Sequence, residues 1–266
     1  MRVEHEETHP AIWRIRLHPG EAGAVRLDAA GVTELMDRVA AADASPECRV
    51  IVLEGTGGCF CMGMDLDAVM VDPADAVKHV HTFARCLGRL RSSPKAVVAV
   101  VDGAAAGGGV GLAAAADIVV ATTRATFALP EAILGLLPAV VMPLLLMRLT
   151  PQKARWLALS GGIDARQALT LGLVDHLVED PTQVERALRP ILKHLLHTCP
   201  ECVAGLKTLG DEIAGLPLDA ALAHGAERTA AMILEPGRIA VFQAFLRGEA
   251  TPPWFASLGK PPGRAP

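Results

Sequence analysis

Short apolar runs and helical stretches alternate through the first half of the chain. Residues 11–17 alternate between apolar and polar positions, which is typical of a half-exposed strand. Asp28 precedes an apolar pattern with helical spacing, and residues 73–90 form a second predicted helix. Three mostly apolar runs favour buried strands: 49–54, 96–101 and 117–121. This order of strands and helices predicts a mainly parallel sheet covered by helices.

The second half of the chain is predicted to be mainly helical. After Glu131, only residues 173–178 are expected to contain a strand. Three prolines are expected at helix starts: Pro200, Pro217 and Pro236. A shift in composition near residue 200 divides the chain into a core, residues 1–200, and a C-terminal helical region, residues 201–266. We interpret this region as an appendage rather than an independent domain.

The composition excludes several classes of protein. Hydrophobic residues make up 51% of the 266 positions and charged residues 20%, so the chain can bury a large core. The net charge of −4, without a run of Lys or Arg, argues against a nucleic-acid partner. Residues 96–121 and 132–147 are apolar but interrupted by Asp, Gly or Pro, so no membrane span is expected. Six scattered cysteines and a charged N-terminus predict a cytoplasmic location.

Two glycine-rich segments follow predicted strands. Residues 57–66 read Gly-Gly-Cys-Phe-Cys-Met-Gly-Met-Asp-Leu, and residues 107–112 read Gly-Gly-Gly-Val-Gly-Leu. A glycine turn between a strand and a helix exposes N–H groups at the positive end of the helix, where they can bind an oxyanion. Neither segment has the sequence of a phosphate loop or the spacing of dinucleotide-binding glycines. The simpler alternative is that these glycines only permit tight turns and close packing.

A single carboxylate, that of Glu131, lies in an otherwise apolar stretch after Pro130. Burial disfavours the charged form and raises the pKa of a carboxyl group, as a general acid or base near neutral pH requires. The alternative is an ordinary first-turn glutamate after a helix-starting proline. Two amide donors and one carboxylate suffice for enolate chemistry on an acyl thioester. The chain contains no tyrosine, which excludes a phenol as the proton donor.

Residues 57–66, 107–112 and 129–131 together resemble the motifs of the crotonase superfamily, the enoyl-CoA hydratases and isomerases. The resemblance extends from about residue 3 to residue 255. It implies an α/β crotonase fold, in which a spiral core of ββα units is followed by a C-terminal helical region. It also implies a homotrimer or homohexamer. No cofactor is expected beyond the CoA or phosphopantetheine that the substrate carries.

The resemblance assigns roles to individual residues. The backbone N–H groups of Met64 and Gly108 match the oxyanion hole of the family, and Glu131 matches its catalytic glutamate after the proline. Family hydratases usually carry another glutamate two residues after the triple glycine. Gly111 stands at that position in this chain. A two-glutamate hydratase mechanism is therefore not expected.

The single glutamate and residues 136–139 look like the branch that handles 3-hydroxy-3-methylglutaryl and 3-methylglutaconyl thioesters. One group in this branch is the methylglutaconyl-CoA hydratases, and the other is the dehydratase of polyketide β-branching cassettes, whose substrate is held on an acyl carrier protein. Residues 60–65, residues 151–154 and the Pro253-Trp254 ending look more like the second group. The resemblance favours a lyase that dehydrates 3-hydroxy-3-methylglutaryl-carrier protein to 3-methylglutaconyl-carrier protein. A CoA-level hydratase and a non-catalytic thioester-binding protein are the alternatives.

Five further residues are candidates for lining the substrate pocket: Met62, Asp65, Leu66, Gly111 and His81. A second acid or base could come from Asp65, His79 or His81. The two histidines fall on the helix that borders the acyl pocket in the family. For each of the three, a structural or solvent-facing role is the favoured interpretation.

Other chemistry-bearing side chains are interpreted as structural. Four residues are of the types that bind zinc: His194, His197, Cys199 and Cys202. Pro200 separates the histidines from Cys202, so no metal site is predicted. Cys59 and Cys61 lack an acidic-thiol environment and are not expected to be nucleophiles. Residues 134–147 are apolar on all sides, which indicates either core or a subunit interface.

Overall fold

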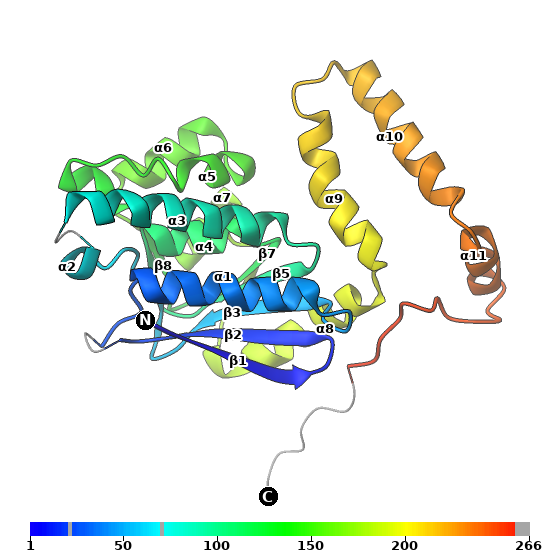
Figure 1. Cartoon of the computed structure of the whole chain (residues 1–266), viewed down its shortest axis with the longest axis horizontal. Coiled ribbons are helices and arrows are strands. Elements are labelled where there is room, and N and C mark those ends of the chain that lie inside the picture. The colour runs from blue at the N-terminus through cyan, green and yellow to red at the C-terminus, as the bar shows by residue number, and fades with distance from the viewer. Residues whose placement is uncertain (21–22, 70–71, 259–266) are drawn as a thin grey trace, which may run out of the picture.

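A six-stranded sheet is the framework of the fold (Figure 1). The computed structural model describes residues 1–20, 23–69 and 72–258. In spatial order, the strands are β1 (Arg2–His9), β2 (Ile12–His18), β3 (Val50–Gly55), β5 (Ala96–Val101), β7 (Ile118–Thr122) and β10 (His176–Val178). β1 and β2 pair antiparallel, and the other four neighbouring pairs are parallel. The mainly parallel sheet agrees with the prediction from the apolar runs.

A smaller sheet continues from the ends of the parallel strands. Its order is β4 (Cys59–Cys61), β6 (Ala104–Ala106), β8 (Thr126–Ala128) and β9 (Ile163–Asp164). β4, β6 and β8 directly follow β3, β5 and β7 in the chain. Each then leads into helical structure: α2 (Leu66–Val69) and α3 (Pro73–Ser92), α4 (Gly108–Ala115), or η1 (Pro130–Leu134) and α5 (Met142–Arg148). This repetition is the predicted ββα spiral.

The central strands are buried on both faces. Ile51 and Leu53 of β3 belong to the apolar layer shared with α1 (Ala29–Ala44), α3 and α4. Their neighbours Val50 and Val52 belong to the layer shared with α8 (Val184–His197), through residues such as Leu188. Side chains alternate between faces along a strand, so both faces need apolar residues. A strand covered by helices on both sides therefore has a continuous apolar sequence.

The structure corrects three expectations about the elements. β1 is an additional strand that apolar periodicity did not predict, because Val3 is its one buried hydrophobic residue. The strand expected within residues 173–178 is limited to β10, since the residues before it form the turn after α7 (Ala165–Leu171). Residues 134–147 form no continuous helix. They divide between the end of η1, a connection and α5, and most of them are exposed.

The C-terminal helices extend away from the body of the molecule (Figure 1). They are α9 (Pro200–Ile213), α10 (Leu218–Ile233) and α11 (Arg238–Leu246), and none of the three contains a buried residue. α9 begins at Pro200 and α10 follows Pro217, as predicted, whereas Gly237 separates Pro236 from α11. The last eight residues of the helical region predicted for 201–266 lie outside the described part of the chain.

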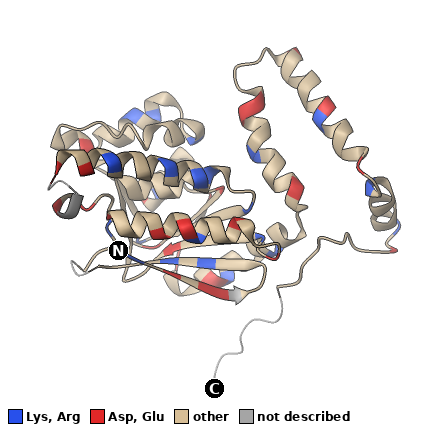
Figure 2. Cartoon of the chain, viewed as in Figure 1, with Lys and Arg blue, Asp and Glu red and all other residues tan. Residues whose placement is uncertain are grey.

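The remaining short elements complete the body. They are α6 (Pro151–Leu159) and η2 (Pro181–Gln183). Figure 2 shows acidic and basic residues interspersed along the helices that face the viewer. Within the described ranges, no helix is both long enough and apolar enough to cross a membrane.

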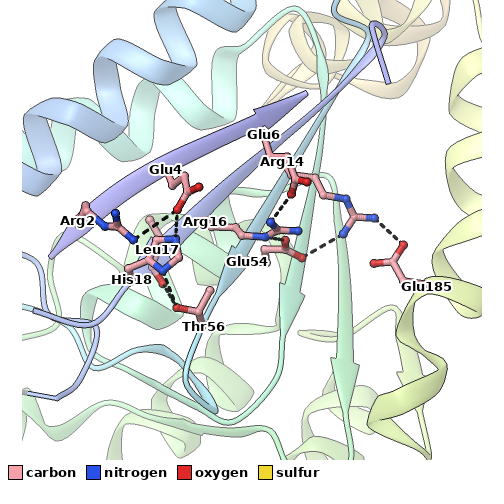
Figure 3. A network of polar contacts seen from close by, with 10 residues as sticks. All are labelled: Arg2, Glu4, Glu6, Arg14, Arg16, Leu17, His18, Glu54, Thr56 and Glu185. Carbon is pink, nitrogen blue, oxygen red and sulfur yellow. Dashed lines mark hydrogen bonds and ion pairs between the residues drawn. The ribbon is translucent and has the colours of Figure 1, made fainter. Parts of the chain in front are cut away.

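A network of charged side chains joins the first strands to α8 (Figure 3). Arg14 is 6% exposed, and its guanidinium donates to a carboxylate oxygen of Glu54 at 3.2 Å and to one of Glu185 at 2.7 Å. Arg16 donates to the other oxygen of Glu54 at 2.6 Å and also pairs with Glu6. Glu54 thus bridges two arginines of β2. Because Arg14 is buried, its positive charge has lost hydration and needs these carboxylates to stabilise it.

Replacing Glu54 by alanine is expected to lower the free energy of unfolding by about 3 kcal/mol, because a buried guanidinium loses a partner. Glu4 pairs with Arg2 and His18 at the surface, so Glu4→Ala should change this free energy by less than about 1 kcal/mol. Urea-induced unfolding of the two variants and the unchanged protein measures both effects. Equal effects at the two positions would contradict the role assigned to Glu54.

Candidate active site

A pocket of about 460 Å³ lies where α3, the first turn of α4 and the segment after η1 meet. It is lined by Leu27, Met62, Leu66 and mostly apolar residues of α3 and of the connection from η1 to α5. Backbone of two glycine-containing turns, at Gly63 and at residues 107–108, also reaches its surface. A few polar groups in a mainly apolar cavity are typical of a small-molecule site.

The backbone at Met64 directs the Met64 N–H group away from the neighbouring segment at Leu27. Met64 forms an isolated parallel bridge with Leu27. The Leu27 N–H donates to the Gly63 carbonyl at 2.7 Å, and the Asp65 N–H donates to the Leu27 carbonyl at 3.0 Å. Successive N–H groups of extended backbone point to opposite sides, so the Met64 N–H points away from Leu27. No acceptor for it is found among the described residues, and Met64 lines the pocket.

Gly108 provides a second N–H group at the same pocket. It is the first residue of α4, after Gly107, whose positive φ of 51° suits glycine. The first N–H groups of a helix have no partner within the helix, and the described backbone contains no other acceptor for that of Gly108. A Cβ built on Gly63 would lie 3.1 Å from the Gly108 nitrogen. The two predicted oxyanion segments are therefore in direct contact.

Glu131 enters the pocket from η1. Its Oε2 atom is buried and has no hydrogen-bond partner within the described part of the chain. Its Oε1 atom would lie 3.0 Å from a Cβ built on Gly107, so the carboxyl group lies against the glycine turn. Burial raises the pKa of Glu131, and the backbone N–H of the same residue partly offsets this effect. The carboxyl group thus has the environment that the sequence predicts for an acid or base.

His79, one of the three candidates for a second acid or base, reaches the pocket from α3. Its side chain is 4% exposed and lines the pocket, and neither ring nitrogen has a partner among the described residues. Burial lowers the pKa of His79, against the opposing effects of the Asp28 carboxylate and the Leu27 backbone. Its position on the buried face of α3 with Ala76 and Phe83 could have been recognised from the helical spacing. His81 also lines the pocket but is exposed.

The chain is similar to known proteins in both sequence and fold. The family model for enoyl-CoA hydratase/isomerase matches residues 7–232. The chain belongs to the enoyl-CoA hydratase/isomerase family. The crystal structure of an enoyl-CoA hydratase/isomerase from Marinobacter aquaeolei has a TM-score of 0.85 and 28% identity, covering 96% of this chain and 99% of that one. Pseudomonas aeruginosa AtuE has a TM-score of 0.86 and 30% identity, with the same coverage.

Similar curated enzymes of this family act on CoA thioesters, as their names state. Carnitinyl-CoA dehydratase of Citrobacter koseri is 35% identical over 178 residues, which are 65% of this chain and 67% of that protein. Enoyl-CoA hydratase ACTT6 of Alternaria alternata is 34% identical over 160 residues, 60% of this chain. The match spans 53% of ACTT6, so the chain covers about half the length of that relative.

Two predicted pocket residues of this family member do not line the pocket. Gly111 is buried between α3 and α5, where an added Cβ would lie 3.1 Å from Val141 and 3.2 Å from Leu87. The Asp65 N–H donates to the Leu27 carbonyl, and Asp65 does not line the pocket. Gly111 is therefore a packing position, where a larger side chain would press on Val141 and Leu87. Met62 and Leu66 line the pocket.

The first glycine pair has a different position from the one expected. Gly57 and Gly58 both have φ near +73° and form the turn between β3 and β4. Neither lines the pocket. The strand-to-helix turn starts only after Cys61, at the end of β4. The expectation that residues 57–65 form one such turn is therefore wrong, and the amide that reaches the pocket comes from Met64.

The cysteines of this region are suited to packing. Burial raises the pKa of Cys61 to about 12 and also raises that of Cys59, so neither is a ready thiolate. Residues 1–20, 23–69 and 72–258 contain no group of three or more His, Cys, Asp or Glu side chains placed to hold a metal ion. The residues considered for zinc binding lie at the junction of α8 and α9.

A second cleft, of about 560 Å³, lies between the body and α9. Two basic side chains that line it, Lys207 and Arg148, already form ion pairs and hydrogen bonds. Lys207 pairs with Asp117 at 2.8 Å and donates to the Lys95 carbonyl at 2.8 Å. Arg148 pairs with Asp175 at 3.2 Å and donates to carbonyls at the end of α4. The Lys207 contacts connect α9 to the body, and the cleft offers no comparable unpartnered polar atom among the described residues.

Replacing Glu131 by glutamine is expected to stabilise the protein at neutral pH. Because the folded-state pKa of Glu131 is raised above its ordinary value of 4.5, its stabilising contribution is present at acid pH and is lost as the pH rises through the folded-state pKa. Glutamine remains neutral throughout. The variant should therefore gain Tm over the unchanged protein as the pH rises from about 4 to about 8.

Thermal unfolding across this pH range measures the difference. The exposed Glu179, which pairs with Arg166, provides the matched control as Glu179→Gln. The same pH-dependent gain in that control would show a general effect of lost charge and would contradict the interpretation of Glu131.

Proposed function

We propose that the protein is a hydro-lyase that removes water from, or adds it to, a branched acyl thioester. The observation that carries this proposal is the meeting, in a single apolar pocket, of one buried carboxylate oxygen and two backbone N–H groups that have no partners among the described residues. The names of the similar family members, a hydratase and a dehydratase of CoA thioesters, support the reaction class. An apolar pocket also strengthens each electrostatic interaction within it.

The proposed dehydration uses three groups of the chain. The thioester oxygen accepts hydrogen bonds from the N–H groups of Met64 and Gly108, which stabilise the enolate as negative charge develops. Glu131, in its carboxylate form, removes the α-proton. It then delivers that proton to the leaving 3-hydroxyl group, so that one water and one enoyl thioester are formed on the same face. The raised pKa of Glu131 suits both transfers.

The close packing around Gly111 supports a mechanism with one glutamate. Side-chain atoms of Val141 and Leu87 lie 3.1 and 3.2 Å from an added Cβ there, so both side chains would have to shift to admit a second carboxylate. Together with the sequence resemblance, this favours the substrate 3-hydroxy-3-methylglutaryl, held on an acyl carrier protein and converted to 3-methylglutaconyl. The names of the curated relatives favour CoA as the carrier, and a methylglutaconyl-CoA or other enoyl-CoA hydratase is the second candidate.

A non-catalytic thioester-binding protein is less consistent with the pocket. A buried carboxylate oxygen without a partner lowers stability, because the charged group has lost its hydration. A binding protein would gain nothing from retaining it. Buried ionisable groups that lower stability are instead common at catalytic sites, where the reaction needs a shifted pKa.

We also propose that the protein works as a homotrimer or homohexamer in the cytoplasm. α10 and α11 contain no buried residue, and several of their large apolar side chains are more than half exposed, among them Leu222 and Phe242. Burial of one such side chain stabilises by about 1.5–3 kcal/mol. A second copy of this chain is the proposed cover for these helices.

The lyase proposal is tested by offering both 3-hydroxy-3-methylglutaryl-carrier protein and the CoA ester, with loss of water followed by mass spectrometry. We expect dehydration of at least one, with the carrier protein preferred. Glu131→Gln should lower kcat by about 10²–10⁴-fold, because it removes the acid and base. Glu179→Gln should keep full activity, since Glu179 is exposed on the body and pairs with Arg166.

Two results would refute parts of this proposal. Absence of dehydration and of the reverse hydration with both carriers would exclude the lyase. Full activity of Glu131→Gln would exclude the mechanism even if the reaction class is right. A preference for the CoA ester would select the second candidate.

The oligomer is tested by sedimentation equilibrium. The unchanged protein is expected to sediment as a trimer or hexamer, and Leu222→Glu with Phe242→Asp should give smaller species, because charges replace apolar contacts. Glu227→Gln, on the exposed surface of α10, is the matched control and should assemble normally. A monomeric unchanged protein at micromolar concentration would overturn this proposal.

A further inference from the structure

His79 contributes an imidazole to the pocket that no group of the described chain satisfies. The side chain is 4% exposed, and both Nδ1 and Nε2 lack hydrogen-bond partners. The Oε2 atom of Glu131 also lacks a partner, so that atom forms no hydrogen bond with His79. A buried polar atom without a partner is unfavourable, and native structures rarely contain one without a reason.

The position of His79 places it beside the oxyanion segments. It precedes Phe83 by one turn of α3, and both side chains lie on the buried face of that helix. A Cβ built on Gly108 would lie 3.0 Å from the Phe83 ring and 2.7 Å from Leu27. The backbone of Leu27 in turn lies close enough to the His79 ring to raise its pKa, against the larger effect of burial. His79 therefore borders the space that an acyl group bound at Met64 and Gly108 would occupy.

The other ionisable side chains of the pocket have different properties. Among the described lining residues, they are Glu131 and His81, and no lysine or arginine lines the pocket. His81 is exposed and can be hydrated. Glu131 is an acceptor when ionised and would repel an anion. His79 is thus the buried side chain of this pocket that can donate a hydrogen bond to an anionic part of a substrate.

We propose that His79 determines specificity by binding the distal carboxylate of the acyl group. The inference rests on the proposed lyase function and names its substrate class, thioesters whose acyl chain ends in a second carboxylate. A carboxylate entering an apolar pocket needs a donor to replace its lost hydration. An approaching anion also favours the protonated imidazole, so both partners gain from the contact. The carboxylate of Asp28 is already used, since it caps α1 and pairs with the N-terminal amine.

The test compares two acyl groups that differ in the distal carboxylate alone. They are 3-hydroxy-3-methylglutaryl and 3-hydroxy-3-methylbutyryl, loaded on whichever carrier the unchanged protein accepts. His79→Leu is expected to lower kcat/KM for the first at least about tenfold, mainly through KM, because the donor is lost. The value for the second should stay within about twofold. His79→Gln, which keeps an N–H donor, should restore part of the preference.

Stability provides a readout that separates this role from a structural one. His79→Leu removes two unsatisfied polar atoms from the pocket, so its Tm should equal or exceed that of the unchanged protein. A histidine kept for folding would give a lower Tm. His176→Gln removes an exposed imidazole of β10 and is the matched control for both measurements.

Binding of unreactive thioesters separates failure of this inference from failure of the lyase proposal. 3-Methylglutaryl-CoA and isovaleryl-CoA lack the 3-hydroxyl group, and their thermal shifts report binding alone. A larger shift by the first that disappears in His79→Leu supports the inference even if no dehydration occurs. Equal loss of activity on both hydroxyacyl groups, or an unchanged preference in His79→Leu, would overturn it.

Discussion

The pocket depends on a backbone contact between the end of β4 and the first turn of α4. A Cβ on Gly109 would lie only 2.0 Å from the Cys61 carbonyl oxygen, so a side chain there would force the two segments apart. At Gly63, a Cβ would lie 2.8 Å from the Ala106 carbonyl, and φ is +81°. Glycine at these positions lets the amides of Met64 and Gly108 approach one another. The same glycines therefore permit the close packing of the two segments and the exposure of the two N–H donors.

The mainly apolar pocket beside this contact contains two buried polar side chains. The Glu131 carboxyl and the His79 imidazole both line the pocket, and each has buried atoms without partners within the described chain. Burial shifts the two pKa values in opposite directions, so that the neutral form of each is favoured. Such groups lower stability until a ligand supplies their partners. This is the usual relation between a stable framework and a site that must remain reactive.

The framework itself could be predicted from residue patterns. The all-buried strand β5 is a continuous apolar run, and α3 has the periodicity of a half-buried helix. β1 was missed because an edge strand needs few apolar residues when its exposed side carries charge. The three-residue strands of the small sheet are too short for periodicity to identify. Their existence depends on pairing with strands that are distant in the chain.

The sequence by itself determined the parallel sheet, the two glycine segments and the isolated Glu131, because apolar periodicity and residue type are local properties. Only the tertiary structure decided which of these residues share a surface. It placed Gly111 in the packing between α3 and α5, separated Gly57 and Gly58 from the pocket, and brought His79 into it. Such placement depends on how helices pack across the sheet, and a local pattern records only which face of a helix is buried, not what that face meets.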